Sequence, residues 1–357
     1  MDSAPTAAVT PDATPAITTA DLRKTFSSRT GPVEAVRGVS IEVGAGEIFG
    51  LLGPNGAGKT TTLRMLTTLL PIDEGAAQVA GFDVAAHPKK VRECIGYVSQ
   101  LGGADELATG RENLILQGRL YGATLAEVRP RVDELATILD LAGFADRRVK
   151  TYSGGQRRRL DVALGIVHQP DVLFLDEPTT GLDPQNRANL WEHLRALRSL
   201  GTTIVLTTHY LEEADVLCDR IVIVDHGRIV AEGTPRELKR RVAGDAVVIT
   251  VREGTDAGGR TMDVLGAEPY VREISAEGDQ LRLYVEDGGT ALPRLLRILD
   301  HERIGIRAMS LSEPTLDDVF LRQTGRSLRD TGPGDDGRDD GPGDGPGDSA
   351  RAATVAA

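Results

Sequence analysis

Apolar residues gather along the chain in short runs that end in glycine or in polar side chains. The clearest runs cover residues 48–52, 95–98, 172–175 and 203–206. Nearly continuous apolar runs of this length are typical of strands buried on both faces, as in a parallel sheet. They predict the centre of an α/β fold, with candidate chemistry where the strands end.

Other stretches alternate apolar and polar residues, which indicates strands with one buried face. Residues 39–43 alternate in this way and predict one half-buried strand, within a region of short strands and turns from about 17 to 43. A β-hairpin is predicted around the turn at 225–228. Alternation recurs at 247–251 and 281–285, so a second, smaller unit with its own strands is expected near the C-terminus.

Leucine-rich patterns at helical spacing separate these strands. They predict helices within 63–70, 160–167, 190–197 and 292–299, and an inserted helical layer with few chemical groups between 106 and 149. A capping-box pattern at Thr315 and Asp318 predicts one more short helix near the end of the chain.

Length and composition limit the classes of protein to consider. The chain has 357 residues, which suggests two or three domains at about 150 residues each. No apolar run approaches the roughly 18–20 residues that a membrane span needs. Residues 1–16 are rich in Ala, Thr and Pro and have no signal-peptide pattern, so they predict a disordered lead.

Charge and cysteine usage narrow the picture further. A net charge of −12 argues against bulk nucleic-acid binding, and much of the acidity lies in the Gly/Asp/Pro/Arg-rich stretch 325–357, an expected disordered tail. Cys94 and Cys218 are far apart, so reduced thiols are expected rather than a disulfide.

The stretch GPNGAGKT at 53–60 lies between the first apolar run and the first helical pattern. Strand, glycine loop and helix are the context in which this spacing binds phosphate. Glycines let successive N–H groups turn inward, and the helix N-terminus adds positive potential. Lys59 is expected to contact the β- and γ-phosphates, and the Thr60 hydroxyl to ligate Mg²⁺. The alternative, an ordinary glycine turn before a helix, does not need all four fixed positions.

A second glycine-opened helix begins near Ser153, which is a good N-cap residue followed by Gly154 and Gly155. Such a helix N-terminus can bind an anion. Arg157 to Arg159 follow, and three successive arginines on a helix are expected to form a solvated face rather than a phosphate site.

Polar side chains at the ends of the apolar runs are the other candidate site residues. Asp176 suits Mg²⁺, and Glu177 is placed to polarise an attacking water, because open α/β sheets bind ligands at this edge. His209 ends a neighbouring run and is expected to contact the γ-phosphate. Gln100 either reaches the Mg²⁺ or the water, or is a solvated loop residue. Phe26 either stacks on an adenine base or belongs to the core.

Taken in their order along the chain, these motifs resemble those of the ATP-binding cassette (ABC) transporter ATPases. The resemblance covers about residues 17–240. The resemblance implies a P-loop NTPase cassette with a RecA-like core sheet, an antiparallel β subdomain and a helical subdomain. It identifies the Q-loop with Gln100, the signature with Ser153–Gln156, the D-loop with Asp183 and the switch residue with His209. It also favours stacking for Phe26, because the family usually has an aromatic residue there.

The resemblance carries over to individual residues. It implies catalysis by Glu177, His209 and Gln100, and a Mg²⁺ site at Thr60, Gln100 and Asp176. The implied ATP-binding residues are Phe26, Gly53, Pro54, Asn55, Gly56, Ala57, Gly58, Lys59, Thr60, Thr61, Ser153, Gly154, Gly155, Gln156 and Asp183. Ser153, Gly154 and Gly155 are implied to close over the γ-phosphate of a second copy, so a homodimer is expected.

Two further stretches, TGRENL at 109–114 and EPTLDDVF at 313–320, look like those of the daunorubicin-resistance type of drug-export ATPase. This similarity implies an ATPase that drives export of a hydrophobic drug or antibiotic through a separate membrane permease. Such a subunit would sit peripherally on the cytoplasmic face of the membrane, with no nucleic acid as partner. The expected domains are 17–240 for the ATP-binding domain and 244–324 for a small α+β accessory domain.

Other functions remain as alternatives to drug export. One is a soluble ABC ATPase acting on ribosomes or DNA, but the chain has neither a second cassette nor a coiled-coil or zinc insertion. A purely regulatory nucleotide switch would not need the acidic pair Asp176 and Glu177 together with His209. An ABC ATPase for another exported substrate stays open, because the substrate path would lie in the permease.

Overall fold

The computed structural model describes residues 14–28, 31–241, 245–252, 259–312 and 314–324. The expected disordered tail, 325–357, and residues 1–13 of the expected lead lie outside the described residues. Ala16, at the end of that lead, is held in place, since its N–H donates to Val43 and its carbonyl accepts from Ala80, each at 2.8 Å.

A six-stranded sheet forms the centre of the molecule, with the strand order β11-β10-β4-β9-β8-β7. Its strands are β4 (Ile48–Leu52), β7 (Ile95–Val98), β8 (Val172–Asp176), β9 (Thr203–Thr208), β10 (Arg220–Asp225) and β11 (Arg228–Gly233). All neighbours pair in parallel except β10 and β11, which form the predicted antiparallel hairpin. The apolar runs of the sequence therefore form a buried parallel sheet, as their continuous apolar character predicts.

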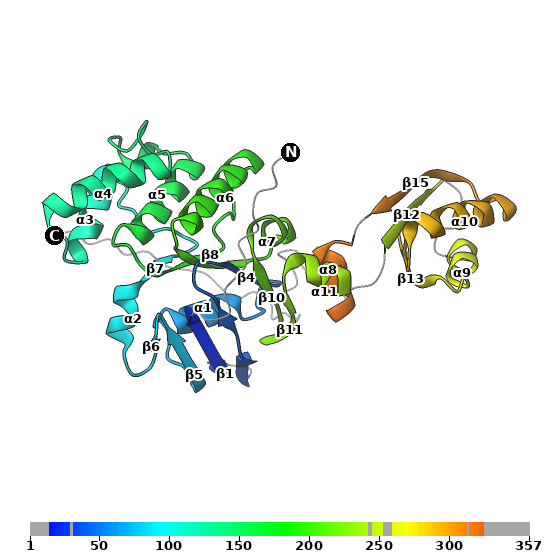
Figure 1. Ribbon diagram of the computed structural model, residues 1–357, viewed down its shortest axis with the longest axis horizontal. Coiled ribbons are helices and arrows are strands. Elements are labelled where there is room, and N and C mark those ends of the chain that lie inside the picture. Colours follow the sequence, from blue (N-terminus) through cyan, green and yellow to red (C-terminus); the bar gives the residue numbers. More distant parts are fainter. Residues whose placement is uncertain (1–13, 29–30, 242–244, 253–258, 313, 325–357) are drawn as a thin grey trace, which may run out of the picture.

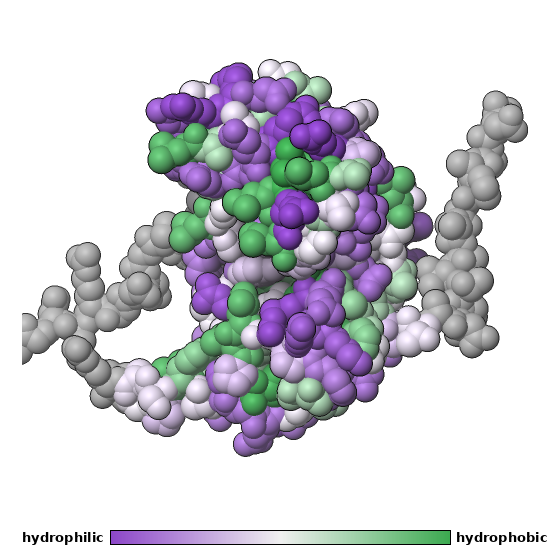
Figure 2. All heavy atoms as spheres, turned by 90° about the vertical axis from the view of Figure 1, so that its left-hand side faces the viewer, coloured by the Kyte–Doolittle hydropathy of each residue, from purple (hydrophilic) through white to green (hydrophobic). Residues whose placement is uncertain are grey.

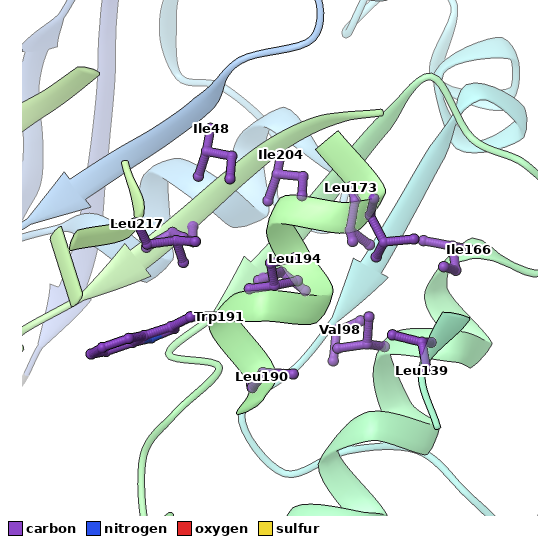
Figure 3. Close-up of a cluster of buried hydrophobic side chains, with 14 of the residues drawn as sticks. Ile48, Val98, Leu139, Ile166, Leu173, Leu190, Trp191, Leu194, Ile204 and Leu217 are labelled. Atoms are coloured by element: carbon purple, nitrogen blue, oxygen red, sulfur yellow. The ribbon is translucent and has the colours of Figure 1, made fainter. Parts of the chain in front are cut away.

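Successive side chains of the central strands point to opposite faces, so each face has its own apolar core. Helices cover one face, where Ile48, Leu173 and Ile204 pack against Leu194 of α6 and Leu217 of α7 (Figure 3). The helices on this side are α3 (Gly110–Leu120), α4 (Leu125–Ile138), α5 (Gly154–Ile166), α6 (Pro184–Ser199), α7 (Leu211–Leu217) and α8 (Pro235–Arg241).

The predicted helical layer between 106 and 149 consists mainly of α3 and α4, followed by a turn-rich segment and the short 3₁₀ helix Val149–Thr151. Thr109 and Thr124 begin α3 and α4 with complete capping boxes. Each threonine hydroxyl accepts from a backbone N–H that the helix itself cannot satisfy, and this fixes where the helix starts.

The other face of the central sheet packs against α1 (Lys59–Leu66) and an antiparallel sheet. The elements here are β1 (Ile17–Ser28), β2 (Gly31–Val39), β3 (Glu42–Val43), β5 (Glu74–Val79) and β6 (Phe82–Asp83), with α2 (Pro88–Cys94) beside them. The single strand predicted at 39–43 is wrong: β2 ends at Val39 and β3 begins at Glu42. The Thr19 hydroxyl accepts from the Ile41 N–H at 2.8 Å, so a side chain interrupts the ladder while the alternation of burial continues.

A separate four-stranded antiparallel sheet, with the order β13-β14-β12-β15, lies at the far end of the molecule from α3 and α4 (Figure 1). It contains β12 (Asp245–Val251), β13 (Val271–Glu277), β14 (Gln280–Val285) and β15 (Ile306–Ser312), and packs with α9 (Arg260–Gly266) and α10 (Gly288–His301). The predicted alternation at 247–251 and 281–285 supplies its core.

The last described helix, α11 (Leu316–Thr324), returns to the cassette. Its apolar face, with Val319 and Phe320, belongs to the same core as Leu238 of α8. On its other side Asp318 accepts hydrogen bonds from Tyr284 and, at 2.9 Å, from Arg282, both on β14. The helix α11 therefore joins the accessory sheet to the cassette.

Two smaller expectations can be checked within the described residues. Neither cysteine forms a disulfide, as predicted, and burial raises the pKa of the Cys218 thiol well above its ordinary value. No helix in the described ranges has the length and apolar character needed to cross a bilayer.

Candidate active site

The phosphate-binding loop leaves β4 at the edge where the parallel strands end, and α1 begins at Lys59. Glycine is needed at two of its positions. A Cβ on Gly53 would lie 2.2 Å from the Val224 carbonyl oxygen, and one on Gly58, where φ is 101°, would lie 2.3 Å from the Ala35 carbonyl oxygen. Neighbouring backbone thus holds the loop closely, and only glycine fits there.

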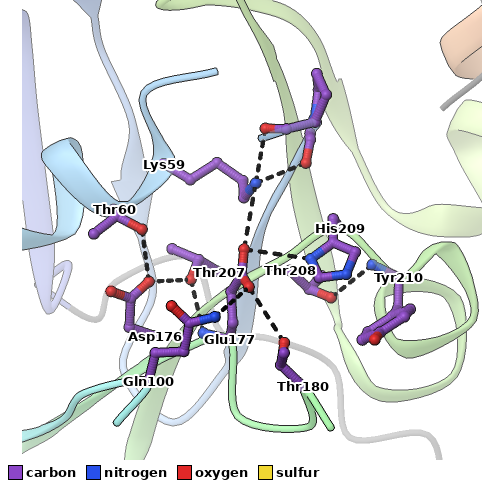
Figure 4. A network of polar contacts seen from close by, with 12 residues as sticks. Lys59, Thr60, Gln100, Asp176, Glu177, Thr180, Thr207, Thr208, His209 and Tyr210 are labelled. Carbon is purple, nitrogen blue, oxygen red and sulfur yellow. Dashed lines mark hydrogen bonds and ion pairs between the residues drawn. The ribbon is translucent and has the colours of Figure 1, made fainter. Parts of the chain in front are cut away.

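Lys59 lies in a buried position at the centre of the site, with a side chain that is 4% exposed. Its ammonium group donates to the carbonyls of Gly53 at 2.7 Å and Pro54 at 2.9 Å, and lies 3.7 Å from Oε1 of Glu177 (Figure 4). Burial lowers the pKa of Lys59, and the nearby carboxylates oppose this. The arrangement is a desolvated positive charge at the mouth of the loop, suited to phosphate oxygens.

Asp176, at the end of β8, is buried and accepts two hydroxyl hydrogen bonds on one carboxylate oxygen. Thr60 donates from α1 at 2.9 Å, and Thr207 donates from β9 at 2.7 Å (Figure 4). The predicted pair Thr60 and Asp176 is therefore brought together across 116 residues of sequence.

Glu177 follows with a positive φ of 46°, which is uncommon for a residue other than glycine, asparagine or aspartate. Its backbone N–H donates to the Thr207 hydroxyl at 3.0 Å, and its carboxylate accepts from Thr180 at 3.2 Å and from Gln100 at 3.3 Å. These contacts hold the backbone in its strained conformation and aim the side chain into the site.

His209, immediately after β9, places Nδ1 3.3 Å from Oε1 of Glu177, within ion-pair distance but without the alignment of a hydrogen bond. Proximity of His209, followed by the charge of Lys59, lowers the pKa of the Glu177 carboxyl, although its partial burial acts in the opposite direction. The carboxylate is therefore ionised at neutral pH and able to accept a proton.

Lys59, Thr60, Glu177 and His209 face one cavity of about 1080 Å³, and Asp176 contacts its wall through Thr60. The phosphate loop forms one wall, and the residues at the ends of β8 and β9 form another. Its lining residues are Phe26, Ala35, Asn55, Gly56, Ala57, Gly58, Lys59, Thr60, Thr61, Gln100, Glu177, Thr180, Arg187, His209, Tyr210, Leu211 and Glu212. Phe26 is 39% exposed, so the interpretation as a core residue is wrong.

The signature residues do not line this cavity. Ser153 begins α5, its hydroxyl accepting from the Gln156 N–H at 3.3 Å in a complete capping box. Asp183 likewise caps α6, since its carboxylate accepts from the Asn186 N–H at 2.9 Å. Both groups therefore occupy helix N-termini elsewhere on the surface of the cassette.

Two structural roles were missed or misjudged from the sequence. Arg158 was expected on a solvated face with its neighbours, but it is 7% exposed and donates to the carbonyls of Ser99 and Pro178, each at 2.7 Å. Thr207, which supports Asp176 and Glu177, has a role that the sequence motifs do not indicate. Its signal was a hydroxyl one residue before the end of the strand next to β8.

Comparisons with known proteins identify the family of the chain. The family model described as ABC transporter matches residues 36–180, and a model of the C-terminal domain of DrrA1-3-like ATP-binding proteins matches residues 233–324. Among solved structures, a dimeric ATP-binding cassette bound to ADP and Pi shares 25% identity with a TM-score of 0.56, covering 61% of this chain and 98% of that chain. An ATP-binding subunit of an ABC transporter shares 28% with the same TM-score, covering 63% and 92%.

Curated relatives match nearly the whole chain. The daunorubicin resistance ATP-binding protein DrrA2 of Streptomyces coeruleorubidus is 46% identical over 308 residues, 86% of this chain and 95% of that protein. The daunorubicin/doxorubicin resistance ATP-binding protein DrrA of Streptomyces peucetius is 44% identical over 89% of this chain and 94% of its own length. The Nod factor export ATP-binding protein I of Rhizobium sp. strain N33 is 40% identical over 88% and 98%. The chain therefore belongs to the ABC transporter ATP-binding proteins of the daunorubicin-resistance type, and is an ATP-hydrolysing subunit of such a transporter.

Proposed function

We propose that this subunit drives export of a hydrophobic drug or antibiotic through a separate membrane permease. The observation that carries the ATPase part is the meeting of Lys59, Glu177 and His209 around one cavity beside the phosphate loop, where Thr60 of the lining is hydrogen-bonded to Asp176. The drug part is supported by the relatives named for daunorubicin and doxorubicin resistance, at 43–46% identity.

In the proposed mechanism, Glu177 takes a proton from the attacking water. The lowered pKa of its carboxyl keeps the base ionised, and its contacts with Thr180 and Gln100 orient it. Lys59 and the loop amides stabilise charge on the transferred phosphoryl group, which is the main task in phosphoryl transfer. His209 is proposed to contact the γ-phosphate from the end of β9.

The oxygen donors fit a Mg²⁺ ion, which would neutralise developing phosphate charge when bound. Mg²⁺ prefers one or two protein oxygens together with phosphate oxygens and water, rather than a cage of side chains. Thr60 and Asp176 supply a hydroxyl and a carboxylate 2.9 Å apart, and Gln100 is proposed as a third donor.

Two copies are proposed to form the working unit. Ser153, Gly154 and Gly155 lie outside the cavity of their own chain, so their helix N-terminus is free to complete the cavity of a partner. A dimeric cassette among the structural neighbours, bound to ADP and Pi, supports this pairing.

A permease is proposed to dock on the side of the cassette that carries α2, α3 and α4, where apolar side chains gather on the surface (Figure 2). A cavity of about 350 Å³ is lined by Leu69, Gln117 and Tyr121, and Leu69 is 54% exposed. Leu101, 95% exposed, directly follows Gln100. This surface would place the subunit peripherally on the cytoplasmic face of the membrane, with the Gln100 loop carrying motion between permease and site.

We also propose that residues 17–240 form the ATP-binding domain and 244–324 the accessory domain. The accessory sheet has a core of its own, which supports the division. The packing of α11 against α8 adds that the two parts are tied together at a second point.

The decisive experiment is reconstitution of the full chain with its membrane partner in vesicles, followed by measurement of ATP turnover against a panel of compounds. Stimulation by daunorubicin-like hydrophobic drugs is expected. A panel in which no hydrophobic drug changes turnover or moves across the vesicle membrane would reject drug export while leaving the ATPase intact.

Export of another substrate is the second candidate function. Relatives named for Nod factor export are 40–41% identical and cover most of both chains, close to the identity of the drug-resistance relatives. The same vesicle assay separates the two, because a Nod factor would then stimulate turnover where the drugs do not.

A further inference from the structure

Glu213 is a buried carboxyl group that the mechanism above does not use. It lies in the first turn of α7, four residues after His209, and its side chain is fully buried. Oε1 accepts from the indole N–H of Trp191 on α6 at 3.1 Å. Oε2 has no hydrogen-bond partner of good geometry among the described residues. A buried carboxyl group with a single hydrogen bond is costly, so its presence needs a reason.

Two of the groups around this carboxyl lie close to the catalytic side chains in the sequence. The hydroxyls of Thr208 and Thr179 both lie close enough to influence its charge, and the Thr179 hydroxyl is itself buried without an aligned partner among the described residues. Thr208 precedes His209, and Thr179 lies two residues after Glu177. The carboxyl therefore sits between the turn that follows β8 and the end of β9.

Each of these threonines is also fixed to the rest of the site through its backbone or hydroxyl. The Thr208 carbonyl accepts from the Gly53 N–H at 3.2 Å, and its hydroxyl accepts from the Tyr210 N–H at 2.9 Å. The Thr179 carbonyl accepts from the Leu182 N–H at 3.1 Å, just before Asp183. A group that links the two threonines would thus fix the distances between the phosphate loop, the switch residue His209 and the D-loop residue Asp183.

Burial raises the pKa of Glu213, against the opposing effect of the nearby hydroxyls, the indole and Arg187. A protonated carboxyl has one O–H donor and can still accept from Trp191. A hydrogen bond between this carboxyl and the Thr179 hydroxyl would give a partner to both unmatched groups.

We propose that Glu213 is a positioning residue for ATP hydrolysis, which joins the turn bearing Glu177 to the turn bearing His209 and so holds these two side chains in register. This inference rests on the roles proposed above for Glu177 and His209. It assigns Glu213 no contact with nucleotide, so its loss should act on the chemical step and not on ATP affinity.

The test compares Glu213→Leu and Glu213→Gln in the full chain, measuring kcat and KM for ATP hydrolysis, equilibrium ATP binding and the thermal unfolding midpoint. Leucine replaces the carboxyl with apolar groups and removes the polar link, so kcat should fall by about tenfold to a hundredfold, as for a small misplacement of catalytic groups. ATP affinity should stay close to that of the unmodified chain. Glutamine keeps one acceptor and a neutral donor, so its kcat should remain near the original value.

Glu192→Leu is the matched control, because Glu192 is an exposed acid beside Trp191 on α6. It should leave kcat unchanged. Should Glu213→Leu fail to fold, Thr179→Val decides, since it removes only the hydroxyl and is expected to lower kcat without changing ATP affinity. A folded Glu213→Leu variant with normal kcat, a glutamine variant as slow as the leucine variant, or an unaffected Thr179→Val would each overturn the proposal.

The role of Glu177 is tested separately by Glu177→Gln. Normal turnover in that variant would reject the proposed base itself. Slow turnover in Glu177→Gln together with normal turnover in Glu213→Leu would reject only the positioning role.

Discussion

At the scale of single residues, the site depends on a carboxylate whose backbone is strained and whose side chain is held from several directions. Glu177 combines a φ of 46° with contacts to Thr180, Gln100 and His209. Such a conformation persists only where the surroundings fix it, and it keeps the base aimed at the cavity.

Glu177→Gln tests this residue directly. The amide keeps the shape of the side chain but cannot take a proton from water. Hydrolysis should fall by about 10²–10⁴-fold, the range for losing a general base, while ATP binding is retained. Measured turnover close to that of the unmodified chain would contradict the role given to Glu177.

Lys59→Ala should weaken nucleotide binding itself. The substitution removes the buried ammonium group that lies at the mouth of the phosphate loop. Equilibrium binding of ATP measures the effect, and Lys89→Ala, at an exposed lysine on α2, is the control. Equal ATP affinity in the two variants would count against the phosphate cradle.

His209→Ala should slow hydrolysis with little loss of ATP affinity. It should also change the pH dependence of the hydrolysis rate. His209 is the largest influence that lowers the pKa of Glu177, so its removal raises that pKa. Activity then disappears at a higher pH as the solution is acidified, because the base is protonated earlier. A pH profile of kcat with an unmoved acid limb would show that the two residues are not coupled.

At the scale of elements, α5 is tied to the catalytic edge of the sheet by one buried guanidinium group. Arg158 donates to the carbonyls of Ser99 after β7, Pro178 after β8 and, at 3.2 Å, Asp176. Burial lowers the pKa of Arg158, and nearby acids oppose this. The helix that presents the signature residues is therefore anchored to the ends of two strands.

Arg158→Met should destabilise the fold by about 2–4 kcal/mol, because the buried carbonyls lose their donors. Chemical unfolding measures this value. Arg157→Met is the matched control, since Arg157 forms an exposed ion pair with Glu106, and a change within about 0.5 kcal/mol is expected there. Similar losses in both variants would mean that the anchor is not Arg158.

The difference between these arginines also shows what the sequence could and could not predict. The phosphate loop, the acidic pair at 176–177 and the buried strands were predictable, because local patterns specify strand, turn and helix start. The fold class was confirmed. Arg158 was not predictable, since helix periodicity says which residues share a face but not that a loop carbonyl from another strand reaches that face. The strand predicted at 39–43 failed for a similar reason, as the Thr19 hydroxyl interrupts it from a distant part of the sequence.

At the scale of the whole molecule, each chain holds one complete phosphate loop and one signature helix facing elsewhere. Gly154 and Gly155 differ in their surroundings. A Cβ on Gly155 would lie 2.1 Å from Oδ1 of Asn186, whereas on Gly154 the nearest atom is Leu182 Cδ2 at 3.9 Å. A side chain at 154 would therefore project outward without disturbing its own chain.

Gly154→Glu is accordingly expected to leave folding and ATP binding of the single chain intact and to abolish pairing. A carboxylate would point toward the partner's phosphate and repel it. Light scattering with ATP, in a Glu177→Gln background that slows turnover, should give the mass of two chains without the substitution and of one chain with it. Unchanged pairing would reject the sandwiched arrangement.

The return of α11 to the cassette has a consequence for any shortened form of this protein. Val319 and Phe320 are buried in the core that contains Leu238, while Asp318 is held by the accessory sheet. Truncation after Arg241 would expose the hydrophobic surface that α11 covers on α8 and α7. The helix α7 starts just after the switch histidine. The truncated cassette would therefore tend to aggregate. Its ATPase rate would be that of a destabilised protein and not the intrinsic rate of the ATP-binding domain.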